Sequence, residues 1–259
     1  MKLKQLTLAV LAASAVSAAF AQTPAPAPAA APAVTPEHSF TPKISLYSEY
    51  EYRGITQTSE KPALQFNFDY VNSSGLYAGL FLTNIKWLKD SAKAGGFKTD
   101  AQLELDLFAG YKFEVVKDIT MDIGYLRYEY PSSNAFKLKP NTDEVYVGLS
   151  GGPFSAKYSY ATSTLFGFAG SKGSSFTEFN WAQEVFPKFT MNAQLARQTV
   201  KKNNDSTYTV YKIGGTYDLG EGWSAGGYYK DTNAKKNAYT VLGKDWSKGR
   251  LVAFVSKAF

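Results

Sequence analysis

The sequence is dominated by a two-residue alternation of apolar and polar side chains that begins near Lys43. From Ala101 to Phe113 every odd position is apolar, whereas the even positions include Gln102, Glu104 and Asp106. Successive side chains of a strand point to opposite faces, so this period predicts a strand with one apolar face. The same pattern recurs along the chain. It predicts an all-β fold of about twelve strands, near 43–54, 62–71, 75–87, 99–113, 119–130, 143–150, 154–163, 174–185, 189–199, 207–218, 223–232 and 250–259.

The connectors between these strands alternate in length. Short turn sequences such as "NSSG" at 72–75 and "GGP" at 151–153 are followed by longer polar segments such as 88–98 and 131–142. Turns rich in Gly, Pro, Asn and Ser are typical of hairpins. We therefore expect an antiparallel up-and-down arrangement with short turns at one end and long loops at the other.

Two architectures accept many amphipathic antiparallel strands. A soluble sandwich or barrel has its apolar faces inside, and an outer-membrane barrel has them outside, facing lipid. Alternation alone does not distinguish the two, because inverting the faces leaves the pattern unchanged. Four features favour the membrane: strand lengths near the roughly 9–11 residues that cross hydrocarbon, alternating connector lengths, aromatic residues near strand ends, and a final amphipathic strand that ends on Phe259.

The first residues predict export. Lys2 and Lys4 precede an apolar stretch that ends in Ala19-Phe20-Ala21, the pattern of a secretory signal peptide, so we expect residues 1–21 to be cleaved after Ala21. The following residues, 22–42, are rich in Pro and Ala and contain His38. Proline disfavours helix, so we expect an extended periplasmic linker there and a barrel over 43–259.

Composition excludes several function classes. The 259 residues carry a formal net charge of +6, which is too mild and dispersed to indicate nucleic-acid binding. Cysteine is absent and His38 is the only histidine, so catalytic sites that use a histidine base, and His or Cys metal sites, are disfavoured. The segments "NNDS" at 203–206 and "GFAGSKG" at 167–173 are interpreted as solvated loops. We expect no enzyme, no cofactor and no metal.

The polar faces of the strands supply the candidate site. In the phase set by the apolar faces they point into the barrel, where acids opposite cations would orient small polar solutes. For Arg53 we expect Glu51, Glu104 or Asp106 as the acidic partner, and for Gly54 a bend where the first strand meets its loop. The candidate pore-lining residues are Glu49, Glu51, Arg53, Gln65, Asp69, Gln102, Glu104, Asp106, Asp122, Glu144, Lys157 and Gln194.

The stretch "YSEYEYRGITQTSEKPALQFNFDY" and the following "SGLYAGLFLTNIKW" resemble the N-terminal signature of the TorF family of porins, also called the Gcw_chp family. The segments "DIGYLRYEYP" at 122–131, "EVYVGLSGGPFSAKYSYA" at 144–161 and "GRLVAFVSKAF" at the end resemble further family segments. This resemblance implies an outer-membrane barrel of a Gram-negative bacterium, with no established substrate. The residues that carry the core motif are Tyr52, Arg53, Gly54, Gln57, Pro62, Ala63 and Gln65.

Three functions stay open on the sequence alone. The first is a narrow porin for passive diffusion of small hydrophilic solutes or ions. The second is a closed outer-membrane barrel that has a structural role or binds partners through its long loops, and the third is a soluble secreted β-barrel that binds a ligand inside. The first two imply outer-membrane lipids and the barrel assembly machinery as partners, with Phe259 as an assembly signal.

Overall fold

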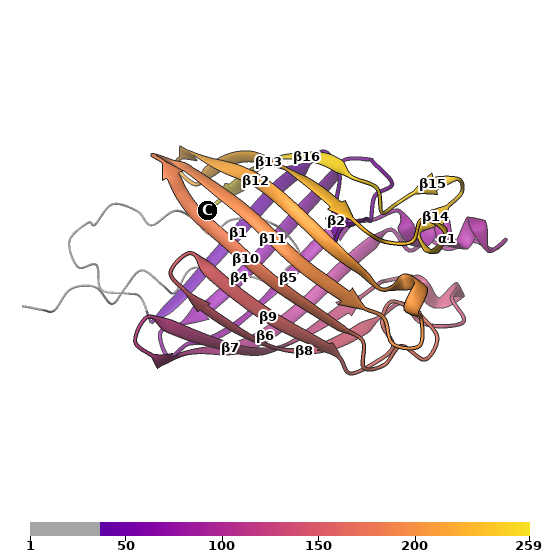
Figure 1. The fold of residues 1–259 in the computed structure, drawn as a ribbon, viewed down its shortest axis with the longest axis horizontal. Helices are drawn as coiled ribbons and strands as arrows, with labels where there is room; N and C mark the ends of the chain where they lie inside the picture. The colour runs from indigo at the N-terminus through magenta and orange to yellow at the C-terminus, as the bar shows by residue number, and fades with distance from the viewer. Residues whose placement is uncertain (1–36) are drawn as a thin grey trace, which may run out of the picture.

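In the computed structural model, which describes residues 37–259, twelve antiparallel strands form a closed β-barrel (Figure 1). The predicted strand number is therefore confirmed. The wall strands are β1 (His38–Tyr47), β4 (Ala63–Asn72), β5 (Leu76–Asn84), β6 (Leu103–Val116), β7 (Ile119–Glu129), β8 (Thr142–Gly151), β9 (Phe154–Ala161), β10 (Ser175–Phe186), β11 (Phe189–Thr199), β12 (Tyr208–Gly220), β13 (Trp223–Thr232) and β16 (Arg250–Ala258).

Each wall strand pairs with its neighbours along the chain, and β1 closes the barrel on β16. The closing register runs from Lys43 opposite Ala258 to Tyr47 opposite Phe254. Closure leaves no wall strand with an unpaired edge, which satisfies the backbone without help from water. Tight turns join the hairpins at one end, the turn side, where both β1 begins and β16 ends (Figure 1).

The longer connections gather at the opposite end, the loop side (Figure 1). They hold the helix α1 (Trp87–Ala94), the single turns η1 (Ser133–Ala135), η2 (Asn204–Ser206) and η3 (Lys236–Ala238), and the short strands β14 (Thr240–Val241) and β15 (Lys244–Asp245). Among the described residues, no helix combines the length and apolar character needed to cross a membrane.

The apolar faces of the wall strands point outward. Leu107 on β6 is 44% exposed, Val147 on β8 41% and Ile213 on β12 53%, whereas Asp106 and Lys230 on the opposite faces of their strands are completely buried. A water-soluble barrel would show the reverse distribution. The apolar exterior is the one that an outer-membrane barrel presents to lipid.

The first part of the chain departs from the predicted boundaries. The first strand was expected near 43–54, but β1 begins at His38 and ends at Tyr47, so His38 lies in a wall strand, where its ring stacks on Tyr70. The strand expected over 75–87 ends at Asn84. Trp87 begins α1 instead, because this helix buries Leu88 and Ala92 on one face. The expected signal peptide and most of the expected linker lie outside the described residues.

Candidate functional site

The segment between β1 and β4, residues 48–62, folds into the loop-side end of the barrel, and we call it the inner segment. In a wall strand alternate side chains would face outward, but here Glu49, Tyr50, Glu51, Tyr52 and Arg53 are all buried. Aromatic and charged neighbours are buried together only if the segment is surrounded on all sides. The prediction that β1 continues to residue 54 was therefore wrong, although its charged residues do lie inside the barrel.

A tight hairpin forms the tip of the inner segment. The strands β2 (Glu51–Tyr52) and β3 (Ile55–Thr56) pair with Tyr52 opposite Ile55, which leaves Arg53 and Gly54 as the two turn residues. Both have positive φ, 47° and 83°, as a type I′ turn requires. A side chain at Gly54 would also meet Thr232 Cγ2 at 2.6 Å. The expected bend at Gly54 is thus the turn of this hairpin.

Arg53 is held by a buried carboxylate on the barrel wall. Its Nη1 and Nη2 atoms donate to the two oxygens of Glu144 at 3.0 and 2.7 Å, and Nη1 also donates to Gln198 Oε1 at 2.9 Å. The guanidinium lies 4.3 Å from the ring centre of Phe176. Bidentate pairs of arginine and carboxylate, such as this one, are among the strongest charge-assisted hydrogen bonds. The predicted partners Glu51, Glu104 and Asp106 were wrong: the wall partner is Glu144.

Burial and pairing act in opposite directions on Arg53. Removal from water by itself disfavours the charged guanidinium and lowers its pKa, but Glu144 and the neighbouring tyrosines Tyr52 and Tyr128 outweigh this effect. The pKa of Arg53 is therefore raised well above its ordinary value. The Arg53 guanidinium is therefore positively charged where it meets Glu144.

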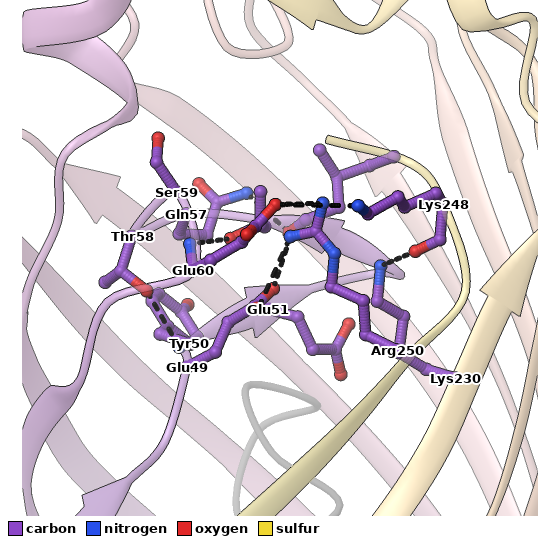
Figure 2. A network of polar contacts seen from close by, with 12 residues as sticks. Glu49, Tyr50, Glu51, Gln57, Thr58, Ser59, Glu60, Lys230, Lys248 and Arg250 are labelled. Atoms are coloured by element: carbon purple, nitrogen blue, oxygen red, sulfur yellow. Dashed lines mark hydrogen bonds and ion pairs between the residues drawn. The ribbon is translucent and has the colours of Figure 1, made fainter. Parts of the chain in front are cut away.

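A second set of ion pairs holds the opposite side of the inner segment. Glu51 pairs with Lys212 on β12. The Arg250 side chain on β16 lies 3.3 Å from Glu49 and 2.9 Å from Glu60 (Figure 2). The ammonium of Lys230 on β13 donates to the Gly54 carbonyl oxygen at 2.7 Å. Wall strands on opposite sides of the lumen are thereby tied through the inner segment.

Hydrogen bonds within and around the inner segment fix its path. The Tyr50 hydroxyl donates to Glu104 Oε1 at 2.7 Å, and the Tyr50 amide donates to Thr58 Oγ1 at 3.0 Å. The Gln57 carbonyl accepts from the Lys86 and Trp87 amides just before α1. The inner segment is therefore fixed both to the wall and to the loops above it.

The family motif splits between the inner segment and the strand that follows. Tyr52, Arg53, Gly54 and Gln57 lie in the inner segment. Pro62, whose carbonyl accepts from Asn84 Nδ2 at 3.2 Å, leads into β4, where Ala63 and Gln65 are buried on the inner face. The motif thus encodes the hairpin tip and its return to the wall.

Several buried polar atoms next to the inner segment have no hydrogen-bond partner among residues 37–259. Both carboxylate oxygens of Asp106 and one of Glu104 are in this state, and the same is true of the Nε atoms of Arg53 and Arg250. An unsatisfied buried group costs about 1–3 kcal/mol, and more when it is charged. In folded proteins, buried polar groups without a protein partner are commonly satisfied by ordered water.

The other predicted lining residues lie nearer the turn side or outside the lumen. Asp69, Asp122, Lys157 and Gln194 are half-buried on inner faces of the wall. Lys157 lies 3.4 Å from Glu178, and Gln194 donates to Glu178 at 2.7 Å. Gln102 precedes β6 and is exposed, so the structure does not place it with the other eleven.

Most of the inward-facing cations were absent from the lining residues predicted from the sequence. Lys43, Lys112, Lys212, Lys230 and Arg250 all lie on inner faces, and three of them bind the inner segment. Their strands did show alternation, but near Trp223–Asp231 the faces are mixed, so the inward phase could not be assigned there. Lys112 was visible as the continuation of the Glu104–Asp106 face and could have been included.

The two segments interpreted as solvated loops contact neighbouring loops. Asp205 of the "NNDS" segment pairs with Lys235, and Asn203 Nδ2 donates to the Ala169 carbonyl at 3.0 Å. Within residues 37–259, no group of three or more acidic or histidine side chains could hold a metal ion.

Porins are among the solved structures with a similar fold. A KdgM porin matches with a TM-score of 0.54 and 8% identity, over 85% of this chain and 99% of that one. A KdgM porin in complex with disordered oligogalacturonate has a TM-score of 0.53 at 8% identity, with 85% and 98% covered. A NanC porin has a TM-score of 0.54 at 11% identity, again with 85% and 98% covered. At these identities the likeness establishes the barrel fold.

Sequence comparison identifies the family. No curated protein matches the chain. A family model described as "Bacterial protein of unknown function (Gcw_chp)" matches residues 30–259, which include the inner segment and all twelve wall strands. The chain therefore belongs to the Gcw_chp family.

Proposed function

We propose that the protein is a narrow outer-membrane porin through which small hydrophilic solutes diffuse passively. The observation that carries this proposal is the distribution of side chains: apolar residues such as Leu107 and Ile213 face outward, and ionisable residues line the interior. Small barrels are filled by their side chains and the large porins are open, so twelve strands support a lumen of intermediate width. The porin architecture of the KdgM and NanC structures agrees with this assignment.

The inner segment is the constriction of this channel. It crosses the lumen at the loop side, and its contacts are mostly polar or charged, such as Arg53 with Glu144 and Glu51 with Lys212. The unsatisfied oxygens of Asp106 and Glu104 support the presence of water beside it. We therefore expect conductance to be small and to depend on how firmly the inner segment is held.

A closed barrel is the second candidate. The complete burial of residues 49–59 favours it, because a segment packed on all sides blocks the lumen at that level. In this case the long loops with α1, β14 and β15 would form a binding surface. The third candidate, a soluble ligand-binding barrel, is opposed by the apolar exterior, which water would have to solvate.

Bilayer recording separates the two membrane candidates. Folded protein that is inserted into a planar bilayer should give small step-like currents, and Arg53→Ala should enlarge them or make them more frequent. Heat-modifiable gel mobility first shows that each sample is folded. If neither the native protein nor the Arg53→Ala variant gave current, the porin would be excluded and the closed barrel with a structural or binding role would be favoured.

A porin of the outer membrane must be exported and assembled there. We propose that residues 1–21 direct export and are cleaved after Ala21, that residues 22–37 lead from the mature N-terminus to the barrel, and that the assembly machinery recognises the last strand up to Phe259. The turn side would then face the periplasm and the loop side the exterior, as in outer-membrane barrels generally. We propose no catalytic activity.

A further inference from the structure

A row of alternating charges follows the inner wall across five neighbouring strands. Lys112 on β6 lies opposite Asp122 on β7, Asp122 opposite Gly148, Gly148 opposite Lys157 on β9, and Lys157 opposite Glu178 on β10. A Cβ at Gly148 would lie 3.7 Å from both Asp122 Cβ and Lys157 Cγ. Glycine at that place therefore lets the acid and the base approach each other across it.

The charges of this row balance, and one more pair of opposite charges lies on the neighbouring wall. Two lysines face two carboxylates in the row, and Lys43 on β1 lies near enough to Asp69 on β4 for the two charges to interact. The row gains further contacts: the Tyr77 hydroxyl donates to Asp122 at 2.5 Å, and Lys157 lies 3.4 Å from Glu178. Paired charges of opposite sign give the lumen a local field but no net potential.

The facing wall carries mainly uncharged polar groups towards the turn side. Asn192 and Gln194 on β11, Thr216 on β12, Ser224 on β13 and Ser256 on β16 occupy its inner face. Because the charges alternate in sign along one arc and the other arc is neutral, the field runs along the charged arc, from each lysine to the neighbouring carboxylate. Such a field orients a dipole and neither attracts nor repels a solute of one net sign.

Aromatic side chains on the inner wall lie over glycines of the next strand. The Tyr77 ring covers Gly110, with its hydroxyl 2.3 Å from where a Cβ would be. Tyr146 covers Gly124 at 2.4 Å, and Phe254 covers Gly226 at 2.7 Å. Rings that rest on the backbone project less into the lumen than rings standing above a side chain.

We infer that the turn-side half of the lumen selects small hydrophilic solutes that carry both charges, such as zwitterions, over solutes with a single net charge. This inference rests on the proposed porin function. The ammonium and carboxylate of a zwitterion can contact neighbouring members of the row at once, whereas an ion of one sign is attracted by one member and repelled by the next. The acids in the predicted list of lining residues are accompanied by inward lysines that the list does not contain, such as Lys43 and Lys112.

Ion selectivity and solute entry test the inference together. In a KCl gradient the permeability ratio of K⁺ to Cl⁻ should lie within about two-fold of unity, as balanced charges require. In liposome swelling, L-glutamine should enter faster than the equally sized L-lysine cation and L-glutamate anion. A ratio strongly favouring one ion, or equal entry of the three amino acids, would overturn the inference but leave the porin standing.

Single substitutions in the row should unbalance it. Asp122→Asn should shift the permeability ratio towards anions and Lys157→Gln towards cations, each by about two- to five-fold, the scale of one charge acting through water at a few ångströms. Tyr158→Phe, on the outward face of β9, is the matched control and should not shift the ratio. An unchanged ratio in both row variants, with folding confirmed by gel mobility, would show that the row does not face the solute path.

The absence of current and of swelling in both the native protein and the Arg53→Ala variant would contradict the proposed porin function, and this inference with it.

Discussion

At the residue scale, the contact between Arg53 and Glu144 matters most, because neither charge is exposed to water. Each side chain is 1% exposed, and the two oxygens of Glu144 are matched to two nitrogens of Arg53. Charges buried in this way stabilise a fold only while both are present. The residues are separated by 91 positions in the sequence, which explains why the motif predicted Arg53 as important without revealing its partner.

Arg53→Ala should destabilise the barrel by about 3–5 kcal/mol, because it leaves the Glu144 carboxylate buried without a counter-charge. Urea unfolding in lipid vesicles measures this change. Arg197→Ala is the matched control, since Arg197 is exposed on β11 and its guanidinium donates to Thr209 Oγ1. The variant Arg53→Ala/Glu144→Ala should recover part of the loss, with a coupling of about 0.5–3 kcal/mol. Equal unfolding midpoints for the two single arginine variants would contradict the assigned contact.

Alanine substitutions at two glycines, Gly54 and Gly152, distinguish the cost of a left-handed backbone from the cost of a steric clash. Gly54 and Gly152 both have positive φ, 83° and 54°, but only Gly54 has a neighbour where a Cβ would be. Gly152→Ala should therefore cost only the left-handed backbone, about 1–2 kcal/mol. Gly54→Ala should cost more, because Thr232 Cγ2 lies 2.6 Å from the added carbon. Thermal midpoints of the heat-modifiable band compare the two, and equal losses would show that the hairpin tip can move aside.

At the element scale, each wall strand has an outer face whose tolerance of charge depends on depth in the bilayer. Val147 lies in the middle of β8, and Phe154 begins β9 beside the turn. In an outer-membrane barrel an arginine costs about 2–4 kcal/mol at the bilayer midplane and about 0–1 kcal/mol near the interface. Folding yield into vesicles should therefore fall much more for Val147→Arg than for Phe154→Arg. A similar yield for both would argue against a membrane-spanning orientation of these strands.

The wall strands could be predicted because their outer faces repeat one residue class over long stretches. β6 shows this clearly: Leu103, Leu105 and Leu107 alternate with Glu104 and Asp106. The inner segment has the same local alternation, and nothing between Ser48 and Tyr52 distinguishes a wall strand from a buried hairpin. Only the glycine in Arg53-Gly54 indicates a hairpin turn at this place. Two-residue hairpin turns of this type require positive φ at both turn residues, and glycine adopts positive φ readily.

At the scale of the whole molecule, the strand number and the closure of β1 on β16 followed from the pattern of hairpins. The contents of the lumen did not, because they depend on which strands face each other across the barrel. Lys212 and Lys230 lie far along the chain from Glu51 and Gly54, which they contact. The periodicity of the sequence predicts which face of the barrel wall a side chain points to, but it does not predict which residue that side chain contacts across the lumen.

The final residue offers a test of assembly. Phe259 follows the last strand, and its amide donates to the Pro42 carbonyl at 3.0 Å next to the β1–β16 seam. Its ring is 69% exposed, so its removal should affect the stability of the finished barrel little. Phe259→Ala should lower the amount of barrel in the outer membrane of expressing cells, while refolding in vitro stays near the native yield. An unchanged cellular amount would exclude a role in recognition by the assembly machinery.

The barrel wall contains an even number of strands, so β1 enters and β16 leaves on the same side (Figure 1). The first residue of β1 and the last residue of β16 therefore lie at the same end of the barrel. In the proposed orientation, a tag inserted directly before His38 or fused after Phe259 would be shielded from antibodies on intact cells, whereas an epitope inserted between β13 and β14 would be displayed to them.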